Sequence, residues 1–205
     1  MEEILCGNGA AELFFAAVQA VWPQKALVIA PSFSEYEEAL RSVGAEVEYY
    51  YLCEEDNFQI RGDYVDKLSE EIDMIFLCNP NNPTGTLFTR EQILRVLAKA
   101  EAMQAYVCVD ECFLPFLEEE ASYSMLPYLA KHPRLLVLRA FTKIYCMAGL
   151  RLGYLACGDT ELQSRIRAKL QPWNTSIPAQ LAGIAALSDT EYLAKTRENL
   201  QAERA

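Results

Sequence analysis

Short apolar runs alternate with longer segments of helical spacing, and this alternation constrains the fold more than any other feature. The runs occupy residues 25–30, 46–52, 74–78, 105–109, 134–138 and 152–157, and most are apolar at nearly every position. A strand that is apolar throughout is buried on both faces, as in parallel sheets covered by helices on both sides. The sequence therefore predicts an α/β fold, a three-layer αβα sandwich with a mostly parallel sheet.

Helices are predicted between and after these strands, at residues 10–22, 35–43, 63–71, 89–103, 159–170, 178–187 and 190–205. The clearest signal belongs to the fourth helix, where Thr89 can cap the first turn and apolar residues recur at helical spacing. The strand at 152–157 begins too soon after Lys143 for a helical crossover, so it is expected to be antiparallel. Gly7-Asn8-Gly9 reads as a loop before the first helix.

Composition excludes several classes of function. The 205 residues, 52% of them hydrophobic, suffice for one domain with a sizeable core, and the net charge of −11 disfavours nucleic acid and anionic membranes as partners. No signal peptide or membrane-spanning run is present in the sequence. Seven cysteines without CxxC spacing indicate reduced thiols in a cytoplasmic protein, and a single histidine argues against a zinc site or a Ser-His-Asp triad.

Lys143 follows the apolar run 135–138 and precedes a second cation, Arg151. A lysine that leaves a buried strand among small residues is expected to be desolvated. Desolvation disfavours the ammonium form and leaves a neutral amine that can form a Schiff base. The alternative is an ordinary surface lysine in a loop between strand and helix.

Two further polar segments follow apolar strands. Residues 79–85, Asn-Pro-Asn-Asn-Pro-Thr-Gly, predict a rigid turn at the carboxyl end of a strand, where open α/β sheets bind ligands and where asparagine amides offer fixed donors. Asp110 ends the run 105–109. An acid in that place can be a helix cap or a solvated edge, or the anion that keeps the ring nitrogen of a cofactor protonated.

In this order the segments resemble the pyridoxal-phosphate enzymes of fold type I, the class I/II aminotransferase superfamily, and most closely histidinol-phosphate aminotransferase and threonine-phosphate decarboxylase. The resemblance extends from Gly7 to about Leu187. It implies pyridoxal 5'-phosphate (PLP) as cofactor and a homodimer as the full-length form. It also implies that residues 1–188 are the large cofactor-binding domain without its amino-terminal arm, and that residues 189–205 begin the interdomain helix, with the small domain absent.

The resemblance assigns roles around the cofactor ring. Lys143 would form the Schiff base and move protons at the substrate Cα, and Asp110 would pair with the ring nitrogen. Asn82 would hydrogen-bond the phenolic oxygen and the substrate carboxylate. Cys112 and Phe33 would touch opposite faces of the ring, although plain core packing is the alternative for Phe33.

The resemblance also assigns a phosphate cup. The backbone N–H groups of Gly9, Ala10 and Ala11 would bind the phosphate at the start of the first helix, where the helix dipole favours an anion. Thr142 and Arg151 would complete the cup. Considered separately, the glycine segment is more typical of a simple turn, and Arg151 of a surface ion pair.

Two positions depart from the usual pattern. Ala140 stands where many relatives carry serine or threonine, so one phosphate contact is lost. Phe113 stands where aminotransferases usually carry tyrosine, and phenylalanine here resembles threonine-phosphate decarboxylase. The expected activity is therefore a PLP-dependent lyase that decarboxylates O-phospho-L-threonine to an aminopropanol phosphate in cobalamin biosynthesis.

Three alternatives stay open. The first is an aminotransferase acting on histidinol phosphate or another amino acid. The second is an inactive fragment that binds only cofactor or a partner. The third, a nucleotide-binding α/β module, is disfavoured because the glycines at 7 and 9 lack GxGxxG spacing.

Overall fold

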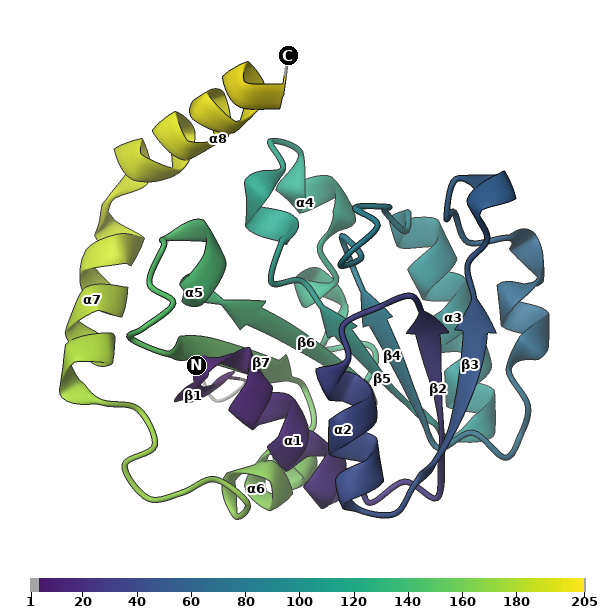
Figure 1. Ribbon diagram of the computed structural model, residues 1–205. Coiled ribbons are helices and arrows are strands. Elements are labelled where there is room, and N and C mark those ends of the chain that lie inside the picture. Colours follow the sequence, from purple (N-terminus) through teal and green to yellow (C-terminus); the bar gives the residue numbers. More distant parts are fainter. Residues whose placement is uncertain (1–3, 205) are drawn as a thin grey trace.

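The computed structural model describes residues 4–204, in which a seven-stranded sheet lies between layers of helices (Figure 1). The strand order is β1-β7-β6-β5-β4-β2-β3. The prediction of an α/β fold with a mostly parallel sheet is confirmed. The strands are β1 (Ile4–Asn8), β2 (Lys25–Ala30), β3 (Glu46–Tyr51), β4 (Met74–Cys78), β5 (Tyr106–Asp110), β6 (Leu135–Ala140) and β7 (Leu152–Cys157).

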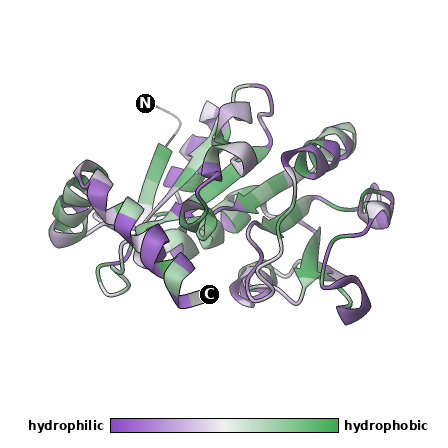
Figure 2. Cartoon of the chain, turned by 90° about the horizontal axis from the view of Figure 1, so that it is seen from above, coloured by the Kyte–Doolittle hydropathy of each residue, from purple (hydrophilic) through white to green (hydrophobic). Residues whose placement is uncertain are grey.

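Helices cover both faces of the sheet. One hydrophobic cluster joins one face of the sheet to α1, α2 and α6, and a second joins the opposite face to α3. Figure 2 shows the apolar strands between helices of mixed polarity. The helices are α1 (Gly9–Val21), α2 (Glu35–Ser42), α3 (Arg90–Met103), α4 (Glu120–Tyr123), α5 (Phe141–Ile144), α6 (Thr160–Arg167), α7 (Ile177–Ser188) and α8 (Thr190–Arg204).

Strand β7 runs antiparallel to both of its neighbours, β1 and β6, while β2 to β6 are parallel. The predicted antiparallel orientation of this strand is therefore correct. The carboxyl ends of the parallel strands meet at the upper edge of the sheet in Figure 1, where α4 and α5 also lie. Because β7 is reversed, its amino-terminal end lies at that same edge.

Helix α3 is positioned as its sequence predicts. The Thr89 side chain accepts a hydrogen bond from the Gln92 backbone N–H at 3.2 Å, and the Gln92 side chain accepts from the Thr89 N–H at 2.8 Å. This capping box satisfies two helix donors, and Ile93, Val96 and Leu97 bury the inner face of the helix.

The prediction of a loop at Gly7-Asn8-Gly9 is wrong in part, because Gly7 and Asn8 belong to β1 and only Gly9 starts α1. Strand β1 is short and half-exposed, and its apolar alternation is too weak to distinguish it from a loop. Gly7 is required there, since an added Cβ would lie 2.5 Å from Cγ of Leu13.

The predicted helix at residues 63–71 is also wrong, since the structure has a 3-10 helix at Gly62–Lys67 followed by a turn. Tyr64 and Leu68 bury their side chains, but the polar residues 69–71 offer no apolar face on which a helix could continue to pack. Helix α6 ends at Arg167, three residues before the predicted end at Leu170. The short helices α4 and α5 were not predicted, and the predicted last residue of α8, Ala205, lies outside the described residues.

Helix α7 keeps an apolar face open to solvent. Ile177, Leu181, Ile184 and Leu187 are each at least 63% exposed. Ile184 and Leu187 line a groove together with Leu5 of β1 and Leu152 of β7. No helix within residues 4–204 combines the length and the apolar character that crossing a bilayer requires.

Candidate active site

A cavity of about 190 Å³ lies at the edge where the parallel strands end. Its walls come from the segments that follow β1, β2, β4, β5 and β6 and from the residues that precede β7. Every predicted site residue except Gly9 lines this one cavity. The lining residues are Ala10, Ala11, Phe14, Phe33, Tyr36, Cys78, Asn82, Asp110, Cys112, Phe113, Ala140, Thr142, Lys143, Ala148 and Arg151.

Asp110 is the buried anion of the cavity, with 5% of its surface exposed. Its Oδ2 accepts a hydrogen bond from the Tyr36 hydroxyl at 2.6 Å, and its Oδ1 accepts from the Cys112 backbone N–H at 2.8 Å. These two donors fix the carboxylate orientation. Since a carboxylate has about four acceptor sites, it can still accept a hydrogen bond from a group bound in the cavity.

Tyr36 was given no role in the site by the sequence interpretation. Its ring stacks on Phe76 with centroids 4.9 Å apart and packs edge-on against Phe33 at 5.5 Å. Burial, with the Asp110 charge, raises the pKa of Tyr36 well above its usual value, so the hydroxyl stays a donor to Asp110. The only sequence signal was a tyrosine among charged residues three positions after Phe33, which is too weak to identify it.

Lys143 lies in α5, a single helical turn directly after β6. Its Nζ is 5.6 Å from the centroid of the Phe113 ring. The expectation that Lys143 is desolvated is contradicted, because the residue is exposed in the structure. The cause is its position on a one-turn helix at the mouth of the cavity, where the described residues wall only part of its side chain.

The asparagines of the 79–85 turn divide into two roles. The Asn79 side chain bonds both backbone groups of Phe88, and the Asn81 amide donates to Pro31 O at 3.0 Å and Thr84 Oγ1 at 2.8 Å. The hydrogen bonds of these two side chains therefore hold the turn in place. Asn82 is the asparagine that lines the cavity and remains available to a ligand.

Gly9 and Arg151 meet at the start of α1 and form a candidate anion-binding corner. Gly9 has a φ of +80°, and an added Cβ would lie 2.5 Å from Nη2 of Arg151, so the guanidinium rests directly on the glycine. Gly153 brings β7 equally close, since a Cβ there would meet Ala10 N at 2.6 Å. The Asn8 side chain makes no capping hydrogen bond to α1, while Glu12 Oε2 accepts one from the Asn8 backbone N–H at 2.7 Å. Backbone N–H groups, the buried Thr142 and a guanidinium thus converge as an anion requires.

The two thiols of the cavity, Cys78 and Cys112, are neutral. Burial, reinforced by the nearby Asp110 charge, raises the pKa of Cys78 to about 12 and that of Cys112 well above its usual value. Both residues therefore present small neutral side chains to the cavity. Among the described residues, no group of three or more His, Cys, Asp or Glu is arranged to hold a metal ion.

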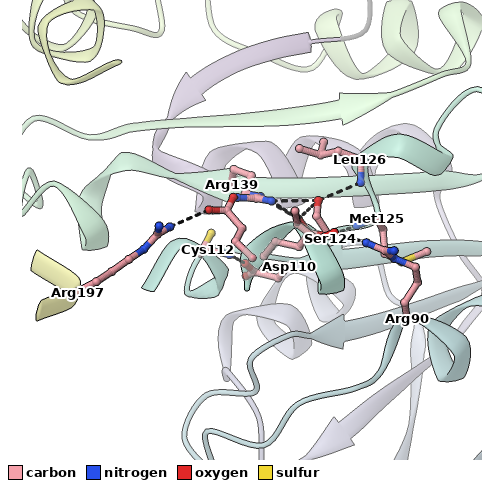
Figure 3. A network of polar contacts seen from close by, with 11 residues as sticks. Arg90, Asp110, Cys112, Ser124, Met125, Leu126, Arg139 and Arg197 are labelled. Carbon is pink, nitrogen blue, oxygen red and sulfur yellow. Dashed lines mark hydrogen bonds and ion pairs between the residues drawn. The ribbon is translucent and has the colours of Figure 1, made fainter. Parts of the chain in front are cut away.

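A buried ion pair behind the cavity was not found from the sequence. Glu111 is 0% and the Arg139 side chain 7% exposed, and Arg139 Nη2 lies 2.6 Å from Glu111 Oε2. Figure 3 shows Arg139 beside Ser124, with Arg197 reaching in from α8. Burial raises the pKa of Glu111, while the Arg139 charge opposes that rise. Because Glu111 and Arg139 lie 28 residues apart in sequence, no local pattern predicts that they pair.

These residues match what PLP requires of a protein: an amine, an anion for the ring nitrogen, an amide for the phenolic oxygen and a cup for the phosphate. The cavity at the carboxyl edge of an α/β sheet gathers candidates for all four, with Arg151 and the start of α1 as the candidate cup. The fold and the site together define a PLP-dependent enzyme of the transferase fold.

The chain belongs to the class I and II aminotransferase family, whose model matches residues 1–205. The resemblance inferred from the sequence is confirmed, and so is PLP as the cofactor of the family. The roles of the single site residues stay predictions.

Three comparisons show the range of relatives. A protein of Caldanaerobacter subterraneus subsp. tengcongensis, provisionally named threonine-phosphate decarboxylase, is 41% identical over 202 residues, which cover 98% of this chain and 55% of that protein. A histidinol-phosphate aminotransferase of Desulfitobacterium hafniense is 39% identical over 211 residues, covering 100% of this chain and 56% of that enzyme. The chain thus spans about half the length of the curated relatives it matches.

The third comparison is with a crystal structure, that of the histidinol-phosphate aminotransferase from Clostridium acetobutylicum. It superposes with a TM-score of 0.90 at 33% identity, covering 98% of this chain and 59% of that one. The fold described above is therefore the fold of this enzyme family.

Proposed function

We propose that the protein is a PLP-dependent lyase that decarboxylates O-phospho-L-threonine to an aminopropanol phosphate, a reaction of cobalamin biosynthesis. The observation that carries the proposal is the single cavity that gathers Lys143, Asp110, Asn82 and Arg151. A relative provisionally named for this reaction, at 41% identity, supports the choice of substrate.

When bound, PLP supplies a ring that accepts the electron pair left by a bond broken at the substrate Cα. Asp110 would hold the ring nitrogen in its protonated form. Its own position is fixed by Tyr36 and by the Cys112 N–H. Asn82 would hold the phenolic oxygen and the substrate carboxylate. Arg151, Thr142 and the first N–H groups of α1 would hold the phosphate.

Lys143 would provide the amine for the cofactor aldehyde. It would also deliver the proton that replaces the departing carboxylate at Cα. Phe113 faces the same amine with a ring that cannot donate a hydrogen bond. The absence of a hydroxyl at this position favours the lyase over a transferase, which usually carries tyrosine there.

A second candidate is transamination of histidinol phosphate or another amino acid, with Lys143 removing the Cα proton. The specific observations that favour it are the 39% identity to a histidinol-phosphate aminotransferase and the TM-score of 0.90 to another.

One pair of assays separates the two reactions on the PLP-loaded chain. Carbon dioxide release from O-phospho-L-threonine without formation of a keto acid supports the lyase. Formation of glutamate from 2-oxoglutarate, with histidinol phosphate converted to the corresponding ketone, supports the transferase and refutes the first proposal. A chain that binds PLP but turns over neither substrate would refute both activities and leave only cofactor binding.

Domain assignment, assembly and location belong to the same proposal. Residues 1–188 would form the large cofactor domain and residues 189–205 would begin the interdomain helix, which agrees with the break between α7 and α8 at Asp189.

The complete protein would be a homodimer, and the exposed apolar face of α7 supports burial against a partner. Light scattering of the purified protein tests this. The free thiols of Cys78, Cys108 and Cys112 support a reducing cytoplasmic location.

A further inference from the structure

The ends of β5 and β6 are tied together directly beside the two residues that would hold the cofactor. Glu111 follows Asp110 in sequence, and Arg139 precedes Lys143 by four residues. Arg139 Nε and Nη2 lie 2.8 and 2.6 Å from Glu111 Oε2. The backbone hydrogen bonds between β5 and β6 continue one residue beyond β5, since the Glu111 N–H donates to Leu138 O at 2.9 Å.

Both carboxylate oxygens of Glu111 accept hydrogen bonds. Its Oε1 accepts from the Met125 backbone N–H at 2.6 Å, and its Oε2 also accepts from the Ser124 hydroxyl at 3.0 Å. Arg139 Nη2 in turn donates to Ser124 Oγ at 3.1 Å. Successive side chains in an extended segment point in opposite directions, so fixing Glu111 on one side of the chain fixes the direction of Asp110 on the other.

The contacts continue from this pair to helix α8. Arg139 Nη1 bonds Glu120 of α4, whose other oxygen lies 3.0 Å from Nη2 of Arg197. Arg197 Nε donates to Pro115 O at 2.9 Å. Two carboxylates and two guanidiniums thus form one chain of balanced charge from β5 to α8, and Figure 3 shows Arg197 at its α8 end.

A second contact joins the same helix to the lysine turn. The ring of Tyr145, directly after α5, stacks on that of Tyr192 of α8 with centroids 5.8 Å apart. The position of α8 is therefore linked to both sides of the cavity, to Asp110 through the ion pairs and to Lys143 through the stacked rings.

We propose that Glu111 and Arg139 are positioning residues for Asp110 and Lys143, and that Glu120 and Arg197 extend this coupling to helix α8. The inference rests on the proposed function, because it assigns to these residues the task of orienting the groups that hold PLP. The alternative is that the cluster only stabilises the fold. In that case a substitution in the cluster would weaken cofactor binding no more than another substitution that lowers the free energy of unfolding by the same amount.

The experiment measures PLP affinity by absorbance titration of the 205-residue chain, after urea unfolding has ranked the stability of each variant. E111Q removes the charge and keeps the shape, and R139K keeps the charge but cannot span two carboxylates with one ammonium. R197Q removes the link to α8, and K195Q is its matched control. Lys195 lies on the same helix, and its one ion pair among residues 4–204 is an exposed i,i+4 contact with Glu191. I93V, in the core of α3, serves as the control for lost stability.

We expect E111Q and R139K to weaken PLP binding by roughly tenfold or more, as for one charged hydrogen bond. R197Q should weaken it by about three- to tenfold, because the ion pair of Arg197 with Glu120 is partly exposed. K195Q and I93V should change it less than about twofold. In E111Q, the pH at which the absorption band of lysine-bound PLP changes should also shift, and in I93V it should not. Equal affinities and equal pH midpoints in E111Q, R197Q and I93V would overturn the inference.

A readout without cofactor separates this inference from the proposed function. If the unmodified chain takes up no PLP, the proposed function fails, and amide hydrogen exchange then decides the positioning role. Faster exchange at residues 141–145 in E111Q and R197Q than in I93V supports it, and equal exchange refutes it. If E111Q fails to fold, R197Q still tests the inference, because the Arg197 side chain is 22% exposed and its replacement leaves no buried charge unpaired in the core.

Discussion

Replacing Gly9 with alanine separates backbone strain from loss of the anion-binding corner. At a φ of +80° an alanine costs about 1–2 kcal/mol relative to glycine, because Cβ approaches the neighbouring carbonyl. At Gly9 the new Cβ would also lie 2.5 Å from Nη2 of Arg151 and would displace the guanidinium. We therefore expect G9A to lose both stability and PLP affinity.

The magnitude of the affinity loss follows from the contact that is displaced. One charge-assisted hydrogen bond to the phosphate contributes about 1.5–3 kcal/mol, so PLP binding should weaken roughly ten- to a hundredfold. Gly44 provides the control, because it has a φ of +77° but nothing within 4 Å of an added Cβ. G44A should lose the same 1–2 kcal/mol of stability and keep its PLP affinity.

Urea unfolding gives the stabilities, and titration with PLP followed by absorbance gives the affinities. If G9A and G44A bound PLP equally well, the Arg151 guanidinium would not depend on Gly9, and the anion-binding corner described here would be wrong. If only G9A lost stability, the strain at positive φ would be overestimated, but the corner would stand.

Three other outcomes are expected. K143A should abolish the borohydride-reducible yellow band while changing stability by less than about 0.5 kcal/mol, because Lys143 is exposed; a retained band would refute its role as the cofactor amine. T89A should cost about 0.5–2 kcal/mol in urea unfolding through loss of the capping box, with PLP affinity unchanged; weaker PLP binding would show that α3 shapes the cavity. Iodoacetamide should label the exposed Cys146 in the native chain but reach Cys108 only in urea, since burial removes access and raises the pKa of that thiol; native labelling of Cys108, read by mass spectrometry, would contradict the burial.

The sheet and most of its helices could be predicted because each carries a local signal. Strand β4 is apolar at every position, and α3 has both a cap and a periodic apolar face. Strand β1 has no comparable signal, since three of its five residues are exposed and a glycine interrupts it. Residues 63–71 look helical in composition, but the short burial of Tyr64 and Leu68 sustains only a 3-10 turn.

The candidate site divides in the same way. Asn82, Asp110 and Lys143 follow recognisable strands, and the rule that parallel strands end at one edge brings them together. Tyr36 and Arg139 act through partners that are 74 and 28 residues away, so only the folded chain identifies them. The exposure of Lys143 was mispredicted because solvation depends on what surrounds α5 in space, and the sequence neighbours of the lysine do not report it.

The reversed strand β7 has a consequence for how the chain is made. Its partner β1 spans residues 4–8, yet it pairs with residues 152–156, so β1 has no place in the sheet until the chain has been made as far as β7. The corner between Gly9 and Arg151 is closed by the same pairing. The contact between Gly9 and Arg151 therefore cannot form gradually, and the late docking of β1 on β7 decides when this side of the cavity is completed.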